Sequence, residues 1–111
     1  MPRVSVIIPV GNGIDFLKQT INTVQNQTLK NIEIICIDDA STDGSGDLLE
    51  DLSKDDKRIV VHHMEKRIGA ARARNIGLDL AISPYVIFLD ADDLWDKEKL
   101  EKQIKFMKEN D

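Results

Sequence analysis

The sequence predicts an α/β fold in which one parallel sheet is covered by helices on both faces. Apolar, β-branched runs alternate four times with segments whose apolar residues recur at helical spacing. The links between these segments are short, which favours right-handed crossovers and therefore parallel strands. No repeat and no linker interrupts the pattern, so we expect residues 1–111 to form a single domain.

The first strand is expected at residues 4–8, ending at Pro9-Val10. Pro9 should mark its exit, because proline lacks the N–H that a strand ladder needs. Asn12 is then expected to cap a helix, with Asp15 three positions on as its capping-box partner. The side of this helix that should face the sheet carries Leu17, Ile21 and Val24.

The second strand should run from residue 32 to about residue 38, and a third is expected at residues 58–62. Between them, the loop at residues 40–44 is dense in turn and capping residues and should lead into a helix. His62 and His63 are adjacent and should point to opposite faces of the third strand, so we expect structural roles for both. The apolar residues that mark the intervening helix are Leu48, Leu49 and Leu52.

After Gly69 an alanine-rich helix is expected, and Ser83-Pro84 should stop it. The fourth strand, residues 85–89, is apolar throughout, which is typical of a strand buried on both faces. The apolar side of the alanine-rich helix carries Ala73, Ile76 and Leu80.

A last helix is expected to begin with Asp96 as its cap. Its charged residues should form exposed i,i+4 pairs, which describes a solvated face rather than a binding patch. The expected pairs are Glu98 with Lys102 and Glu101 with Lys105, and the buried face carries Leu100, Ile104 and Met107.

Composition narrows the class of protein. A net charge of −5 argues against a nucleic-acid partner, since phosphate backbones require a basic surface.

The single cysteine, Cys36, lies mid-strand and is expected to be a buried hydrophobe in a reducing cytosol. We expect no signal peptide, and no apolar run approaches the roughly 20 residues of a membrane span. A cytoplasmic location follows, with a peripheral position at the inner face of the membrane as the alternative for a full-length form.

Two acidic strand exits point to a metal and a phosphorylated ligand. Asp90-Ala91-Asp92-Asp93 follows the fourth strand, and its crowded carboxylates repel one another. A divalent cation such as Mg²⁺ or Mn²⁺ relieves that repulsion, because it takes oxygen ligands and bridges to phosphate. Asp38-Asp39 ends the second strand. Carboxyl ends of parallel strands meet at one edge, where ligands bind in such sheets.

The loop from Asp39 nearly satisfies the calcium-loop pattern, but a strand precedes it and Gly46 stands where a hydrophobic residue is usual. We therefore expect Ser41, Thr42 or Asp43 to cap the next helix and Asp39 to contact a ligand. No dinucleotide or P-loop glycine motif is present, so phosphate charge should be met by metal and arginine. Arg72 and Arg74 diverge around their helix; we assign Arg74 to the ligand and Arg72 to solvent.

An ordered set of motifs now resembles a known family. Its parts are residues 4–10, Asn12, Gln27-Thr28, residues 38–45, residues 73–77 and residues 88–93. Together they resemble the N-terminal half of an inverting, family 2 glycosyltransferase with the Rossmann-like GT-A fold. The resemblance covers nearly the whole chain, and we expect its parallel sheet in the strand order 3-2-1-4.

The resemblance implies a nucleotide-sugar site, for which a UDP-sugar is expected. Pro9 and Val10 would line the base, with Asn12 nearby, and Asp39 would accept a hydrogen bond from uracil. Arg74 would sit near the pyrophosphate, and Asp90, Ala91 and Asp92 would form the DxD element that touches ribose and metal. Asp92 and Asp93 are the expected ligands of a Mn²⁺ or Mg²⁺ cofactor. The ion would neutralise the charge that develops on the departing nucleoside diphosphate.

The chain departs from the family pattern at three positions. Gly11 stands where tyrosine is common, Arg67 replaces a frequent asparagine, and Arg72 replaces a small residue. The family's general base would lie beyond this chain, so no catalytic residue is named. We expect these residues alone to be inactive, as the donor-binding half of a truncated catalytic domain.

The expected acceptor, in the full-length protein, is a saccharide or a lipid-linked acceptor in polysaccharide biosynthesis. Self-association through the exposed edge of the sheet is also expected. The alternative function is a non-catalytic module that binds nucleotide or metal. A phosphoryl-transfer receiver domain has a similar layout, but it requires a lysine at a late strand exit, and none is in the right place.

Overall fold

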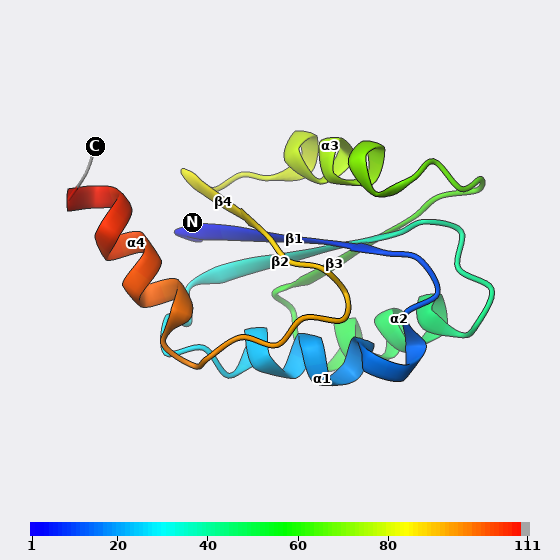
Figure 1. Cartoon of the computed structure of the whole chain (residues 1–111), viewed down its shortest axis with the longest axis horizontal. Coiled ribbons are helices and arrows are strands. Elements are labelled where there is room, and N and C mark those ends of the chain that lie inside the picture. Colours follow the sequence, from blue (N-terminus) through cyan, green and yellow to red (C-terminus); the bar gives the residue numbers. More distant parts are fainter. Residues whose placement is uncertain (110–111) are drawn as a thin grey trace.

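The computed structural model describes residues 1–109, in which strands and helices alternate along the chain (Figure 1). The elements are β1 (Val4–Val10), α1 (Ile14–Gln25), β2 (Ile32–Asp38), α2 (Ser45–Asp55), β3 (Ile59–His63), α3 (Ala70–Leu80), β4 (Tyr85–Phe88) and α4 (Lys99–Glu109). Every expected element is present, and β3 begins and ends one residue later than predicted. No helix among these residues has the length and apolar character needed to cross a membrane.

The four strands form one parallel sheet in the order β3-β2-β1-β4, which confirms the predicted fold. β1 lies between β2 and β4 and is paired with both. Its register with β2 runs from Val4↔Ile32 to Val10↔Asp38. The carboxyl ends of β2, β1 and β4 therefore meet at one edge of the sheet.

Helices cover the two faces of the sheet unequally. Figure 1 shows α3 on one side, with α1 and α2 on the other. The larger core lies on the α1 side, because alternate residues of β1 point there and meet the apolar faces of α1, α2 and α4. The buried helical residues are the expected Leu17, Ile21, Val24, Leu49, Leu100 and Ile104, with Leu48, Leu52 and Met107 partly buried against them. Cys36 is buried in this core, and burial raises the pKa of its thiol to about 12.

α3 approaches the sheet more closely than a side chain would allow. A Cβ at Gly77 would lie 2.4 Å from Cγ2 of Ile7, so only glycine fits this helix position. Ala73, one turn earlier, is fully buried in the same small core with Ile7, Ile35 and Ile37. Leu80 was expected to face the sheet, but it is 39% exposed because the close contact is made earlier in the helix.

β1 ends at Pro9-Val10, as the sequence predicts, and both residues are paired with β2. Leu89 N donates to Ile7 O at 3.0 Å and Asp39 N donates to Val10 O at 2.8 Å, so alternate residues of β1 bond to opposite neighbours. The nitrogen of Pro9 faces the β4 side, where pairing ends at Ile7↔Phe88. Because no residue of β4 is paired with Pro9, the missing N–H does not deprive any carbonyl of β4 of its hydrogen-bond donor.

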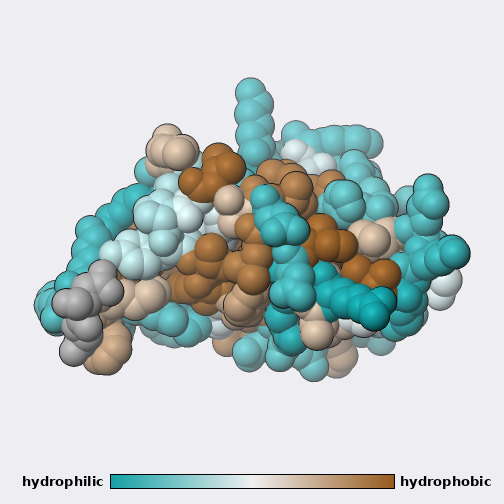
Figure 2. Space-filling model, turned by 90° about the horizontal axis from the view of Figure 1, so that it is seen from above, coloured by the Kyte–Doolittle hydropathy of each residue, from teal (hydrophilic) through white to brown (hydrophobic). Residues whose placement is uncertain are grey.

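The expectation that the fourth strand is buried on both faces is wrong. β4 is an edge strand, and α3 packs on β1 and β2 rather than over it. Ile87 is buried, whereas Phe88 is 44% exposed. Seen from the α3 side, hydrophobic residues gather across the middle of the surface (Figure 2). Exposed large hydrophobic residues from this part of the chain are Leu78, Leu80, Ile82 and Phe88. Self-association through this edge stays a prediction.

The last helix also differs from the prediction. α4 begins at Lys99, and Asp96 instead heads the preceding turn, where its Oδ2 accepts a hydrogen bond from Glu98 N at 3.2 Å. The expected pair of Glu98 with Lys102 is present at 3.4 Å.

The second expected pair on α4 is not formed within residues 1–109. Glu101 accepts a hydrogen bond from Thr28 Oγ1 at 2.6 Å instead of pairing with Lys105. The start of α4 lies against the loop after α1, since Thr28 N also donates to Lys97 O at 2.8 Å. Tertiary contact therefore decides the partner of this glutamate.

Candidate functional site

The candidate site lies along the carboxyl edge of the sheet. Asp39 follows β2, Pro9 and Val10 end β1, and Asp90 comes shortly after β4. Because β1 lies between β2 and β4, its end separates the two acidic exits. The topology therefore brings Asp39 and Asp90, which are far apart in the chain, to the same edge of the sheet.

Asp39 is a buried carboxylate that shapes one end of the site. It is 4% exposed, and its two oxygens accept hydrogen bonds from Ile68 N at 2.7 Å and Gly69 N at 2.9 Å. Gly69 has a φ of +90°, which turns the chain into α3 so that both amides can face this carboxylate. Each carboxylate oxygen has a second lone pair, so Asp39 can still accept a hydrogen bond from a ligand.

A cavity of about 230 Å³ opens beside Asp39. Besides Asp39, its lining residues are Pro9, Val10, Gly11, Arg67, Gly69 and Ala70. One wall thus comes from the end of β1 and the other from the loop that leads into α3. Three of the residues predicted to contact the nucleotide, Pro9, Val10 and Asp39, share this cavity.

Asn12 does not cap α1, which corrects the sequence prediction. Gly13 occupies the N-cap position, and Asp15 lies in the first turn without a capping-box partner in Asn12. The backbone of Asn12 is left-handed, with a φ of 56°, and this turns its side chain toward the neighbouring loop. There Asn12 Oδ1 accepts a hydrogen bond from Thr42 N at 2.7 Å. Asn12 is therefore a bridge between the loops that follow β1 and β2.

The acidic exit of β4 forms the other end of the site. Asp90 Oδ1 lies 3.1 Å from Arg74 Nη2, so α3 contributes a cation there, while Arg72 is exposed as predicted. The Asp92 carboxylate is exposed and has no hydrogen-bond or ion-pair partner within residues 1–109. Thr20 Oγ1 donates to Ala91 O at 2.8 Å and thereby ties this loop to α1.

A second cavity, of about 330 Å³, lies beside Asp92. It shares Pro9 and Gly11 with the cavity beside Asp39, so the two cavities adjoin across the end of β1, and we refer to them together as the groove. Its other lining residues are Asn12, Gly13, Phe16, Ala91 and Asp92. The groove thus carries a buried acceptor at one end and exposed carboxylates at the other.

The acidic loop fits a shared metal site rather than a closed one. Within the described residues no three His, Cys, Asp or Glu side chains are grouped so that they could hold a metal by themselves. Asp92 is free, and Asp93 uses only Oδ1 locally, accepting from Leu94 N at 3.0 Å. Such a donor set suits a hard cation that takes its remaining oxygen ligands from a phosphate and from water.

Asp38 belongs to the same acidic strand exit as Asp39, but its role is structural. Its side chain accepts from Ser41 N at 3.0 Å and lies 2.7 Å from His63 Nδ1, while His63 Nε2 lies 2.7 Å from Glu50. Burial alone would raise the pKa of Asp38, but the hydrogen bonds from His63 and Ser41 outweigh it and lower that pKa. A Cβ at Gly46 would lie 2.6 Å from Asp38 Oδ2, so α2 closes over this carboxylate.

Gln27 has a structural role beside the candidate site that the sequence did not predict. It is fully buried at the end of α1. Its Nε2 donates to Asp96 O at 2.7 Å, and its Oε1 accepts from Leu100 N at 3.0 Å. Gln27 thereby anchors the segment that follows the acidic loop. The Gln27-Thr28 motif was part of the family resemblance. A polar residue next to a turn does not by itself predict that its side chain is buried and hydrogen-bonded to another segment.

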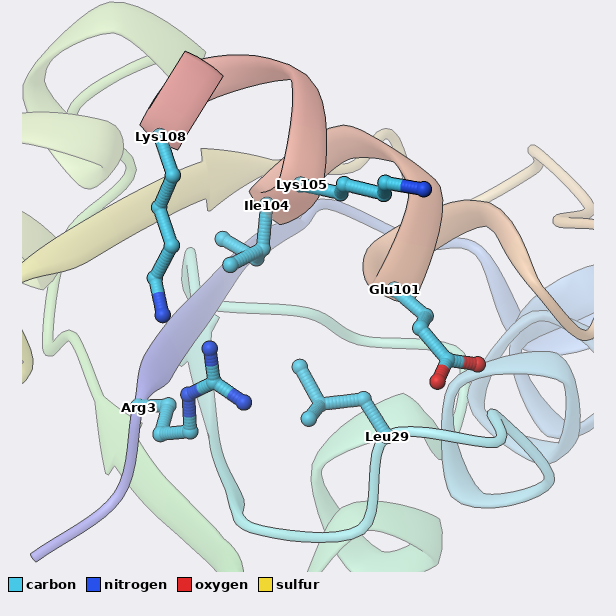
Figure 3. Close-up of a pocket in the computed structure, with 6 residues that line it drawn as sticks. All are labelled: Arg3, Leu29, Glu101, Ile104, Lys105 and Lys108. Carbon is cyan, nitrogen blue, oxygen red and sulfur yellow. The ribbon is translucent and has the colours of Figure 1, made fainter. Parts of the chain in front are cut away.

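A further hollow, of about 290 Å³, lies away from this edge. It opens near Arg3, at the amino end of β1, where Leu29 and Ile104 form an apolar floor (Figure 3). The remaining lining residues, Glu101, Lys105 and Lys108, come from α4. No buried polar group points to a ligand there, so this hollow is not the candidate site.

Several known proteins resemble this chain over nearly its whole length. The model of the family described as "Glycosyl transferase family 2" matches residues 5–111. TuaG of Bacillus subtilis, whose name provisionally places it in teichuronic acid biosynthesis, is 48% identical over 97% of this chain and 43% of its own length. WfaP of Escherichia coli, a UDP-Glc:alpha-D-GlcNAc-diphosphoundecaprenol beta-1,3-glucosyltransferase, is 42% identical over 96% of this chain and 42% of its own length. The chain thus spans less than half the length of these curated relatives.

Solved structures show the same fold. TarS of S. aureus in complex with UDP-GlcNAc superposes with a TM-score of 0.88 and 28% identity, over 96% of this chain and 31% of that one. The mannosyltransferase PcManGT of Pyrobaculum calidifontis, in complex with GDP-Man and Mn²⁺, gives a TM-score of 0.89 and 27% identity, over 96% and 32%.

Proposed function

Because the chain belongs to glycosyltransferase family 2, we propose that residues 1–111 form the domain that binds the nucleotide-sugar donor, a UDP-sugar. The observation that carries this proposal is the groove across the end of β1. It joins a buried hydrogen-bond acceptor, Asp39, to the exposed carboxylate of Asp92. A nucleoside diphosphate offers a hydrogen-bond donor on its base for Asp39 and phosphates that a divalent cation would bridge to Asp92.

The base is proposed to enter the cavity beside Asp39. Pro9 and Val10 offer it an apolar wall, and Asp39 accepts a hydrogen bond from the ring N–H of uracil. The two backbone amides that Asp39 already binds hold the carboxylate in place, so little side-chain entropy is lost on binding. The complex of TarS with UDP-GlcNAc supports a uridine nucleotide, whereas PcManGT was solved with GDP-Man.

The ribose and the diphosphate are proposed to lie toward the acidic exit of β4. Asp90 and Ala91 would meet the ribose, Asn12 lines the groove, and Arg74 would approach the phosphates from α3. Asp92 and Asp93 would hold a Mn²⁺ or Mg²⁺ ion together with the diphosphate. When bound, the cation neutralises charge on the leaving nucleoside diphosphate. The Mn²⁺ in the PcManGT complex supports this assignment.

Transfer of the sugar is proposed for a protein of the relatives' length. WfaP is named for a diphosphoundecaprenol-linked acceptor, which favours a saccharide or lipid-linked acceptor, a role in polysaccharide biosynthesis and a position at the inner face of the membrane. The general base that deprotonates the acceptor is not proposed among the residues described here.

Titration calorimetry with UDP, with and without Mn²⁺, tests the proposal. We expect weak binding of UDP alone and at least several-fold tighter binding with the metal, because the ion bridges Asp92 to the diphosphate. Equal affinities in both conditions would contradict metal-dependent binding, and no binding in either would contradict a donor site. If a chain of the relatives' length bound UDP-sugar tightly but transferred nothing to any acceptor, the alternative of a non-catalytic nucleotide-binding module would be favoured.

A further inference from the structure

Arg67 stands directly over the backbone of Gly11. A Cβ built at Gly11 would lie 3.3 Å from Arg67 Nη1 and 3.9 Å from both Cζ and Nη2. The guanidinium therefore lies in contact with the position that a Cβ at residue 11 would take. Because Gly11 has no side chain, the Arg67 guanidinium can approach the backbone at the end of β1.

Within the part of the chain that the structure describes, no hydrogen bond or ion pair holds this guanidinium. Among residues 1–109, Arg67 makes no side-chain hydrogen bond and no ion pair, whereas Arg74 is paired with Asp90 and Arg58 with Asp56. Yet Arg67 lines the same cavity as Asp39. An arginine without a partner beside a buried carboxylate, in a cavity with an apolar wall, is available to a ligand.

We propose that Arg67 covers one face of the donor's base, in the place that Gly11 leaves open. This inference rests on the proposed function and adds to it the residue that packs on the base. The planar guanidinium stacks on nucleobases and is attracted to their π face. Asp39 then binds the edge of the ring while Arg67 lies on its face.

The position of Arg67 favours the base over the diphosphate. The cavity that it lines contains Pro9, Val10 and Asp39, but neither Asp90 nor Asp92. The acidic end of the groove already has a cation of its own, Arg74, at 3.1 Å from Asp90. Arg67, in the loop before α3, thus serves the end of the groove that binds the base. Arg74, within α3, serves the acidic end.

Calorimetry with three probes, uridine, UDP and inorganic diphosphate, tests this assignment. Arg67→Ala should weaken uridine and UDP by the same factor, about 3- to 30-fold for the loss of a cation–π contact, and leave inorganic diphosphate unchanged. Arg67→Lys keeps the charge but not the planar group, so it should lose most of the same affinity. Arg72→Ala removes the same charge from an exposed position on α3 and should change none of the three.

The outcomes separate this inference from the proposed function. A loss confined to UDP and diphosphate would assign Arg67 to the phosphates and overturn the inference. So would a loss no larger than that of Arg72→Ala, or full affinity in Arg67→Lys. If the unmodified chain bound neither UDP nor uridine, the proposed function itself would fail. Circular dichroism should show all variants folded, since Arg67 is exposed and makes no hydrogen bond or ion pair among residues 1–109.

Discussion

Asp43 Oδ2 accepts a hydrogen bond from Ile14 N at 3.0 Å, so a side chain from the loop after β2 caps the helix that follows β1. Its Oδ1 accepts from both Ser45 N at 3.0 Å and Ser45 Oγ at 2.6 Å, at the start of α2. The hydrogen bonds from Ser45 and then from Ile14 hold the pKa of Asp43 below its usual range. One carboxylate therefore joins the first turns of two helices beside the candidate site.

Asp43→Ala should destabilise the fold, because both helices lose an N-terminal hydrogen-bond acceptor at once. Urea denaturation monitored by circular dichroism measures the change. Asp51→Ala, which removes an exposed carboxylate of α2, is the matched control and should change stability by no more than about 0.5 kcal/mol. Equal effects of the two substitutions would show that Asp43 is not a structural cap.

Asp39→Asn should weaken uridine and UDP alike while leaving inorganic diphosphate unchanged. The amide keeps one acceptor oxygen, but it places an NH₂ group against either a backbone N–H or the base N–H. We also expect a loss of about 1–3 kcal/mol in the free energy of unfolding, since one buried amide loses its acceptor. Calorimetry at a temperature where the variant is folded separates the two effects. Unchanged uridine affinity would remove Asp39 from base recognition.

Asp92→Asn should abolish the tightening of UDP binding by Mn²⁺ and leave uridine binding unchanged. The substitution keeps the shape of the side chain but removes the negative charge that a divalent ion requires. Its effect on folding should be small, because Asp92 is exposed and unpaired within the described chain. Asp96→Asn, in the turn before α4, is a suitable control. A full Mn²⁺ effect in Asp92→Asn would place the cation elsewhere.

His63 should make stability depend on pH near neutrality. The hydrogen bonds to Asp38 and then to Glu50 raise the pKa of His63 above 6.5, so the folded state favours the protonated ring. The resulting stabilisation is fully present below about pH 6.5 and is lost as the pH rises through the folded-state pKa. Unfolding experiments between pH 5.5 and about 8.5 should therefore show the advantage of the wild type over His63→Gln shrinking with pH.

His62→Gln is the control for this pH dependence, because His62 is an exposed neighbour on the same strand. Its stability should follow the wild-type curve across the range. A constant difference between wild type and His63→Gln at all pH values would show that the ring is not protonated preferentially in the folded state.

The sequence by itself determined the fold class and the edge of the sheet where the site lies. Apolar periodicity and short links are local properties, and they require parallel strands whose carboxyl ends meet. Asp39 and Asp90 could therefore be assigned to one edge before any coordinates were known. The sequence also assigned Arg74 to the ligand and Arg72 to solvent, and in the structure Arg74 lies 3.1 Å from Asp90 while Arg72 is exposed.

Only the tertiary structure decided how the loops at that edge are held. Asn12 looked like a helix cap, yet a left-handed backbone directs it to Thr42, and the cap of α1 comes from Asp43, about 30 residues away. The burial of Gln27, the exposure of Phe88 and the contact of Arg67 with Gly11 were equally beyond reach. Each depends on which segments pack together in space, and local propensity carries no information about partners that are distant in the chain.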